Sequence, residues 1–288
     1  MTRNDPTPLP GTTLVIGATG TTGSRLCAEL AAAGQAVRAA GRRATPVAGA
    51  EPVAFDWYDA ATHAAALDGA GRVYVVPPVG DPAPAAVVLP FLRRARAAGV
   101  RRAVLLSASA IEEGGPAAGQ VHAALPGVFD EWAVLRPSWF MQNFTGGHLH
   151  AQGIRSHGVN HTATGSGRVG FVDAGDIAAV AVRALTDRHA PNTDLVLTGP
   201  EALGYDDVAA IVAEVTGRPV VHRPLPPERM RARLSALMPE EFAAMLTAMD
   251  EAIAAGAEDR VTDTVRAVTG RPARDFRSVL EREGGHGG

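Results

Sequence analysis

Short apolar runs alternate with helical stretches along the first half of the chain. Six runs have the length and composition of buried strands, and they occupy residues 13–16, 36–40, 52–55, 72–76, 102–107 and 132–135. Between them, apolar residues recur at helical spacing, for example at Leu26, Leu30 and Ala33 ahead of Gly34. Regular strand–helix alternation predicts an α/β fold, a Rossmann-like, doubly wound parallel sheet with helices on both faces.

The pattern loosens after about Ser138. Residues 146–170 are rich in Gly, His, Ser and Thr and have little periodicity, so we expect a loop that covers one side of the site. Two further strand–helix units are predicted at 169–185 and 195–216, followed by several short helices over 226–282.

Two parts of the chain are therefore expected. Residues 1–145, with sheet-completing segments at about 168–200, form the Rossmann domain. Residues 146–288 form the covering loop and a smaller, mostly helical C-terminal part. Asp173 and Asp176 resemble a carboxylate pair, but their place at the start of a helix predicts that they cap and charge its N-terminus.

Gly17, Gly20 and Gly23 stand between the first predicted strand and the first predicted helix, at the spacing G-x-x-G-x-x-G. Glycines at this junction let the backbone turn tightly and approach a pyrophosphate, whose charge is favoured at a helix N-terminus. The strand before the motif and the helix after it make the signal specific. We therefore expect a dinucleotide site, in which Thr19 and Thr22 join the three glycines.

The end of the second predicted strand favours NADPH as the cofactor. NAD-binding sites usually hold the ribose 2′-hydroxyl with an Asp or Glu about 20 residues beyond the glycines. Here Gly41, Arg42 and Arg43 follow the strand, and the strand contains no acid. Guanidinium groups form paired hydrogen bonds with phosphate, so Arg42 and Arg43 are predicted to select NADP(H) over NAD(H).

Ligands of doubly wound sheets bind outside the carboxyl ends of the strands. The remaining cofactor contacts are therefore expected from residues that follow strands, namely Asp56, Trp57, Pro77, Pro78, Ser107 and Pro137. The hydroxyl of Ser107 either reaches the nicotinamide ribose or the substrate, or it bonds to nearby backbone.

Composition limits the class of partner. The chain has 288 residues, a formal net charge of −3 and a pI near 6.3, which give no electrostatic reason to expect nucleic acid or a membrane as partner. Residues 1–11 are polar and proline-rich without an apolar signal core, and Cys27 is the only cysteine. We expect a cytoplasmic protein, monomeric or homodimeric, that acts on a small molecule. The glycine-rich segment 284–288 is predicted to be disordered.

All 27 basic residues are arginines, because the sequence contains no lysine. A Schiff-base lysine is therefore excluded. The Tyr-x-x-x-Lys pair, with which many short-chain dehydrogenases donate a proton to a carbonyl oxygen, is excluded as well. Carbonyl reduction by that usual route is not expected.

Nine segments together carry a family resemblance. They are residues 17–23, 55–57, 75–78, 99–109, 114–122, 135–144, 171–173, 198–201 and 256–260. On these segments the chain resembles the atypical, NmrA-like branch of the short-chain dehydrogenases, and it is most similar to the festuclavine and agroclavine dehydrogenases of ergot alkaloid biosynthesis. The resemblance implies an NADPH-dependent reductase that delivers hydride to the C=N carbon of a cyclic imine or iminium in alkaloid or other secondary-metabolite biosynthesis.

The implied chemistry agrees with the missing lysine. A carbonyl gains negative charge as hydride arrives and needs a donor nearby, whereas a tertiary iminium becomes neutral and needs none. Ser107 and His122 are the two candidate catalytic residues. His122 is expected to open the helix after the fifth strand, where the family places a polar or basic residue near the cofactor. It either contacts the nicotinamide ribose or returns a proton to a secondary imine, or it is an ordinary exposed helix histidine.

The segment after the sixth predicted strand is aromatic in a chain that has only 14 aromatic residues. Aromatic faces attract flat cations, which suits an iminium, and core packing at a strand end is the alternative. The predicted substrate-binding residues are Trp139, Phe140, Met141, Asn143 and Phe144.

Four histidines, at positions 148, 150, 157 and 161, are close enough in the sequence to raise the question of a metal site. No cysteine is near and no shared helical face is predicted, so we expect no metal and place these histidines on a mobile loop over the substrate. Two other functions stay open. One is a reductase of quinones or activated C=C bonds, and the other is a non-catalytic, NADP-sensing regulator of the NmrA-like type.

Overall fold

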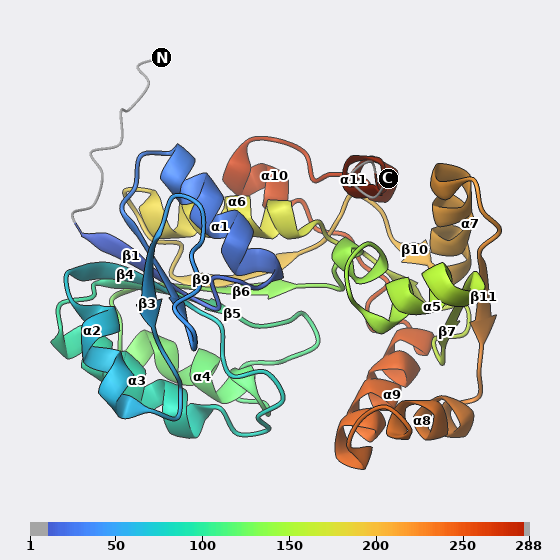
Figure 1. Ribbon diagram of the computed structural model, residues 1–288, viewed down its shortest axis with the longest axis horizontal. Helices are drawn as coiled ribbons and strands as arrows, with labels where there is room; N and C mark the ends of the chain where they lie inside the picture. Colours follow the sequence, from blue (N-terminus) through green and yellow to red (C-terminus); the bar gives the residue numbers. More distant parts are fainter. Residues whose placement is uncertain (1–10, 285–288) are drawn as a thin grey trace. The chain divides into compact units, whose positions relative to one another are not determined.

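The computed structural model describes residues 11–284 and divides into two compact units (Figure 1). The first unit runs up to Arg136 and includes Ala174–Val196. The second unit comprises Pro137–Asp173 and the chain from Leu197 onward. The first ten residues and the last four lie outside the described residues. The polar, proline-rich start of the chain and most of the segment predicted to be disordered, 284–288, fall there.

A seven-stranded sheet forms the centre of the first unit. Its strands, in spatial order, are β3 (Glu51–Ala54), β2 (Val37–Gly41), β1 (Thr12–Ile16), β4 (Ala70–Val75), β5 (Arg102–Leu106), β6 (Glu131–Pro137) and β9 (Thr193–Leu197). Neighbouring strands from β3 to β6 pair in parallel. β9 also runs parallel to β6, because Asn192 N donates to Trp132 O and Ser138 N donates to Leu197 O.

Helices cover both faces of this sheet, which confirms the predicted doubly wound α/β fold. α1 (Thr21–Ala32) and α6 (Ala174–Thr186) pack together on one face, and Figure 1 shows α2 (His63–Leu67), α3 (Ala85–Ala97) and α4 (Ala118–Ala124) on the other. Short 3-10 turns precede α2 (η1, Ala60–Thr62) and follow α4 (η2, Leu125–Gly127). Central strands such as β1 and β5 are apolar on both faces because both are covered.

The second unit is mostly helical, as predicted. Its helices are η3 (Met141–Phe144), α5 (Leu149–His157), α7 (Tyr205–Thr216), α8 (Pro227–Ser235), α9 (Glu240–Ala254), α10 (Thr264–Thr269) and α11 (Phe276–Gly284). Two short strand pairs complete it, with β7 (Val159–Thr162) parallel to β11 (Val221–Pro224) and β8 (Arg168–Val169) antiparallel to β10 (Leu203–Gly204). Within residues 11–284, none of the helices combines the length and the hydropathy needed to span a bilayer.

Two predictions for the second half were wrong. Residues 146–170 are not a mobile loop, since they hold α5 and β7, and Gly158 ends α5 at a φ of +66°. The predicted strand at 169–172 does not extend the main sheet. Only Arg168 and Val169 are in a strand, which pairs with β10 inside the second unit.

The boundary between the units also differs from the expected one at residue 145. By packing, the chain divides after Arg136, at the end of β6, and only Ala174–Val196 returns to the first unit. The division into a nucleotide-binding domain, 1–145, and a substrate part, 146–288, stays a prediction about function.

Asp173, directly before α6, forms hydrogen bonds with three side chains of the second unit. Its carboxylate is fully buried and accepts hydrogen bonds from Arg274 Nη1 (2.6 Å), Arg282 Nη2 (3.0 Å) and Gln142 Nε2 (2.8 Å). It therefore joins α11, the segment before it and η3 within the second unit. The prediction of a simple helix cap was too narrow.

Candidate active site

The glycine loop of the first unit has the geometry of an anion site. Gly17 adopts a φ of +76°, and Gly20 N donates to Gly17 O at 2.9 Å. A Cβ on Gly23 would lie 2.2 Å from Gly17 O, so the first turn of α1 can approach the loop only if this residue is glycine. No side chain caps α1 and no acid stands in its first turn. The helix N-terminus therefore stays available to a pyrophosphate.

The two threonines of the loop differ. Thr19 is exposed at its tip, where it can meet a ligand. Thr22 is buried, and Tyr74 Oη donates to its hydroxyl at 3.4 Å from β4. The side chain of Thr22 thus connects α1 with the sheet, which leaves its backbone as the part that can meet a cofactor.

Arg42 and Arg43 follow directly after β2, and both side chains are exposed. Neither guanidinium has a hydrogen-bond or ion-pair partner among the residues that the structure describes. Arg38, on the same strand, is by contrast bound to Glu51 and to the carbonyl of Asp68. The backbone bond from Ala18 N to Ala40 O joins the glycine loop to this strand end. Both guanidinium groups are thus exposed at the end of β2, and their role in binding a 2′-phosphate stays a prediction.

Asp56 and Trp57 shape the carboxyl end of β3. The Asp56 carboxylate accepts from Tyr58 N at 3.0 Å and closes a turn. Trp57 Nε1 donates to Val76 O at 3.2 Å, and its ring packs edge-on against Phe91. Beyond Val76, Pro77 and Pro78 are half-buried at the end of β4. The described contacts of Asp56 and Trp57 are therefore internal, and they give this edge of the sheet its form.

Ser107 and His122 each carry a buried polar atom without a partner among the described residues. Ser107 follows β5, where its backbone N donates to Leu135 O and its Oγ is unsatisfied. His122 lies in the last turn of α4 and not in its first, and it is 3% exposed with Nδ1 unsatisfied. Buried polar groups are almost always satisfied. Thr13, His63 and Arg72 of the same unit also carry unsatisfied buried atoms, so this feature alone does not mark Ser107 and His122 as cofactor contacts, and that role stays a prediction.

The segment after β6 belongs to the second unit. Pro137, the last residue of β6, is buried, and backbone bonds tie the next turn to Val172, through Val172 N to Trp139 O and Met141 N to Val172 O. Met141 and Phe144 are at most 5% exposed and belong to an apolar core with Phe171 and Phe276. Core packing therefore accounts for these two predicted substrate residues.

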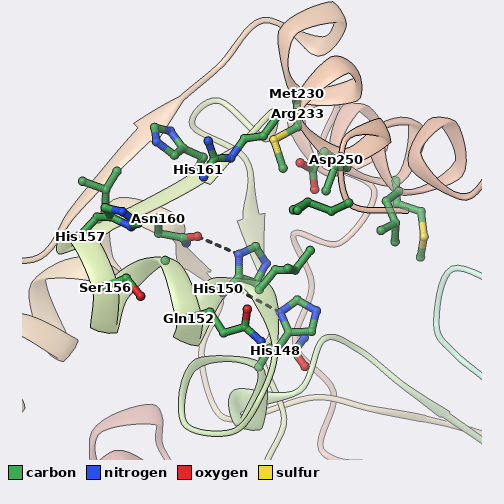
Figure 2. A pocket seen from close by; sticks show the side chains of 18 of the residues that line it. His148, His150, Gln152, Ser156, His157, Asn160, His161, Met230, Arg233 and Asp250 are labelled. Carbon is green, nitrogen blue, oxygen red and sulfur yellow. Dashed lines mark hydrogen bonds between the residues drawn. The ribbon is translucent and has the colours of Figure 1, made fainter. Parts of the chain in front are cut away.

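Trp139 and Asn143, in contrast, line a cavity of about 290 Å³ inside the second unit. Phe140 is half-buried and is not part of the lining. α8 and α9 supply mainly apolar side chains to the cavity, while α5 and β7 supply polar ones (Figure 2). Cavities that bind small molecules combine an apolar wall with a few polar groups in this way.

The four histidines of the predicted loop all line this cavity, but they are held by regular structure. His148 caps α5, His150 and His157 lie on α5, and His161 lies on β7. His150 Nδ1 donates to Asn160 Oδ1 at 2.7 Å, as Figure 2 shows. Burial lowers the pKa of His150 to about 3 and also lowers the pKa of His148, so both rings are neutral near pH 7. Among the described residues, no three side chains are grouped to hold a metal ion.

Sequence reasoning missed several polar residues of the cavity, among them the only carboxylate of its lining, Asp250 on α9. One carboxylate oxygen accepts from Ala163 N at 2.7 Å, and burial raises the pKa of Asp250 to about 6. In the sequence Asp250 is one of several acids on an amphipathic helix. Nothing in the periodicity distinguishes it from its exposed neighbour Glu251.

Comparison with known proteins shows the family of this chain. A family model for NAD(P)H-binding proteins matches residues 17–188. Agroclavine dehydrogenase of Claviceps fusiformis is 43% identical, over 77% of this chain and 80% of its own. Festuclavine synthase II of Penicillium roqueforti is 38% identical, over 94% and 98%. The uncharacterized oxidoreductase YesF of Bacillus subtilis is 44% identical, over 91% and 92%.

Solved structures share the fold. The NADPH-dependent quinone oxidoreductase of Escherichia coli, in complex with NADPH, has a TM-score of 0.78 at 22% identity and covers 94% of this chain and 99% of its own. The triphenylmethane reductase of Citrobacter sp., in complex with NADP(H), has a TM-score of 0.75 at 24% identity and covers 95% and 99%. These structures confirm the expected fold, the curated relatives confirm the expected resemblance, and the family model shows a nicotinamide dinucleotide, NAD(P)H, as the class of cofactor. This chain belongs to the NmrA-like, NAD(P)H-binding branch of the short-chain dehydrogenases, and it is an oxidoreductase related to the festuclavine and agroclavine dehydrogenases.

Proposed function

We propose that this protein is an NADPH-dependent reductase that delivers hydride to the C=N carbon of a cyclic imine or iminium. The observation that carries the proposal is a nucleotide site without a proton-donating Tyr–Lys pair, in a chain that contains no lysine. Relatives named for the clavine alkaloids festuclavine and agroclavine support the same substrate class.

The residues of the chain supply binding and orientation. When bound, NADPH provides a hydride, which gives the iminium carbon its new C–H bond while the nitrogen keeps the electron pair of the former π bond. The amine product of a tertiary iminium is neutral, so no side chain has to donate a proton. Orientation of the reactants alone is worth roughly 7–11 kcal/mol in favourable cases. Ser107 and His122 serve as contacts to the cofactor, and Trp139 and Asn143 as contacts to the substrate.

The cofactor preference is tested at the end of β2. Arg42→Ala is expected to weaken NADPH binding about 10- to 100-fold, because charge-assisted hydrogen bonds contribute about 1.5–3 kcal/mol. NADH affinity should change little. Fluorescence titration with both cofactors measures the effect. Arg101→Ala, which removes an equally exposed arginine at the amino end of β5, is the matched control. Equal affinities for NADPH and NADH in the wild type would contradict the assignment.

The substrate contact is tested by a pair of aromatic substitutions. Trp139→Ala is expected to raise KM for a cyclic iminium about 3- to 30-fold, since a cation over an aromatic face gains roughly 0.5–2 kcal/mol. Phe140→Ala should have a smaller effect, because Phe140 does not line the cavity. Steady-state kinetics gives KM for both variants, and NADPH dissociation constants show whether cofactor binding is unchanged. A larger effect from Phe140 would show that the cavity does not hold the substrate.

Initial rates of NADPH oxidation with cyclic imines, quinones, enones and aldehydes test the reaction itself. Turnover is expected with imines and iminium ions at a kcat/KM at least tenfold above that of aldehydes. A preference for quinones or enones would support the reductase of activated C=C bonds instead. NADPH binding without turnover of any of these substrates would support the regulator.

A further inference from the structure

Asp250 is the one carboxylate in the lining of the second unit's cavity. It stands on α9, on the same wall as the apolar side chains of Leu246 and Met249, and Figure 2 shows its oxygens directed toward the cavity. One oxygen, Oδ2, accepts from Ala163 N at 2.7 Å. The other has no hydrogen-bond or ion-pair partner among the residues that the structure describes. A negative charge with a free oxygen thus borders a mostly apolar space.

The groups around Asp250 do not neutralise it. Burial lowers the pKa values of His148 and His150, so neither ring is a cation near neutral pH. Arg233 reaches the lining from α8 but is exposed and makes no ion pair with Asp250. The other ionisable groups of the lining are His148 at the N-terminal cap of α5, His150 and His157 of α5, His161 of β7 and Arg233 of α8. Tyr205 of α7 lies outside the lining, and burial, together with the charge of Asp250, raises its pKa.

An ionised carboxylate in an apolar wall is costly unless a positive group pairs with it. The cavity has room for such a group, and the half-buried ring of Trp139 belongs to the same lining. A carboxylate together with an aromatic face is the combination that holds an organic cation. A neutral substrate would leave the carboxylate unpaired and would lower affinity.

We propose that Asp250 is the counter-ion for the positively charged nitrogen of the substrate, and that this cavity selects cyclic organic cations over neutral rings of the same shape. This inference rests on the proposed reductase function and narrows its substrate to the charged iminium. Asp250 contacts the substrate and orients it. It takes no part in proton transfer.

The charge of the substrate changes during the reaction, which makes the role of Asp250 measurable. Hydride converts the iminium cation into a neutral amine, so the attraction to Asp250 is strongest before the reaction and weaker in the transition state. Removing the charge should therefore raise KM without lowering kcat. A residue that donates protons, or that only supports the fold, would not give this separation.

Redox-inert probes separate this inference from the reductase proposal. The cationic probe is N,N-dimethyltetrahydroisoquinolinium, and the neutral probe is the dimethyltetralin in which carbon replaces its nitrogen. Dissociation constants are measured with the NADP⁺-bound protein for the wild type, Asp250→Asn and Glu251→Gln. Asp250→Asn keeps an acceptor for Ala163 N. Glu251→Gln removes the same charge from the next, exposed residue of α9 and is the matched control.

The wild type is expected to bind the cation at least tenfold more tightly than its neutral isostere. Asp250→Asn should abolish this preference, and Glu251→Gln should keep it. If Asp250→Asn binds the cation as tightly as the wild type does, or if the wild type prefers the neutral probe, the inference is wrong. Cation preference without turnover of imines would refute only the reductase proposal. Turnover of imines without cation preference would refute only the role of Asp250.

The pH dependence gives a second test that needs no variant to fold. Burial raises the pKa of Asp250 to about 6 in the free cavity, and cation binding requires the ionised form. Affinity for the permanently charged probe should be constant above about pH 7 and should fall up to tenfold per pH unit below about pH 6. A flat profile for the wild type between pH 5 and 8 would overturn the assignment.

Discussion

Gly23→Ala is expected to abolish NADPH binding and to lower the free energy of unfolding by about 2–3 kcal/mol. The new Cβ would lie 2.2 Å from Gly17 O and 2.9 Å from Ala18 Cα. Both are backbone atoms, so either the glycine loop or the first turn of α1 has to move. Because the same loop is the expected pyrophosphate site, a shift of this size should reduce affinity for NADPH more than 100-fold.

Gly127→Ala provides the control for this substitution. A Cβ at Gly127 would meet no atom within 4 Å, and the residue lies in a 3-10 turn away from the loop. Thermal unfolding and NADPH titration of both variants make the comparison. If Gly23→Ala binds NADPH as well as Gly127→Ala does, the close approach of α1 to the loop is not what positions the cofactor.

Asp173→Asn is expected to be the most destabilising substitution in the second unit, with a loss of about 3–5 kcal/mol. The carboxylate is fully buried and pairs with Arg274 and Arg282, so its replacement by a neutral amide removes the negative charge that both guanidinium groups contact. The variant should unfold at markedly lower temperature and urea concentration than the wild type.

The same substitution at an exposed ion pair is the matched control for Asp173. Asp263 pairs with Arg266 at 2.9 Å on the surface of α10, and both side chains are about two-thirds exposed. Asp263→Asn should cost less than about 1 kcal/mol, because exposed pairs are solvated and screened. If the two variants have the same unfolding midpoint, the buried pairs do not hold α11 in place.

The nucleotide-binding half could be predicted from the sequence because its signals are local. Buried parallel strands are apolar on both faces, so each forms a visible run, and all six predicted runs match strands of the sheet. The G-x-x-G-x-x-G spacing reports the backbone geometry directly. Gly17 needs a positive φ, and Gly23 needs the absence of a Cβ. Arg42 follows the end of β2, where its position is set by the strand itself.

The second unit could not be predicted in the same way, because long-range packing decides its structure. Residues 146–170 appear irregular as a sequence, yet α5 forms there once Ala151 and Ile154 are buried against neighbouring elements. The apolar run at 169–172 has a strand-like composition, but only a short pairing with Leu203 and Gly204 is available to it. Secondary structure in such segments follows the tertiary contacts and not the local pattern.

The sequence by itself thus determined the sheet, the glycine loop and the arginines after β2, since each depends on neighbours along the chain. Only the tertiary structure decided which side chains line the cavity. Trp139 and Met141 are two residues apart, yet one borders the cavity and the other is in the core. Asp250 and Glu251 are adjacent acids on α9, and only the packing of α9 on its neighbours turns one inward and leaves the other exposed to water.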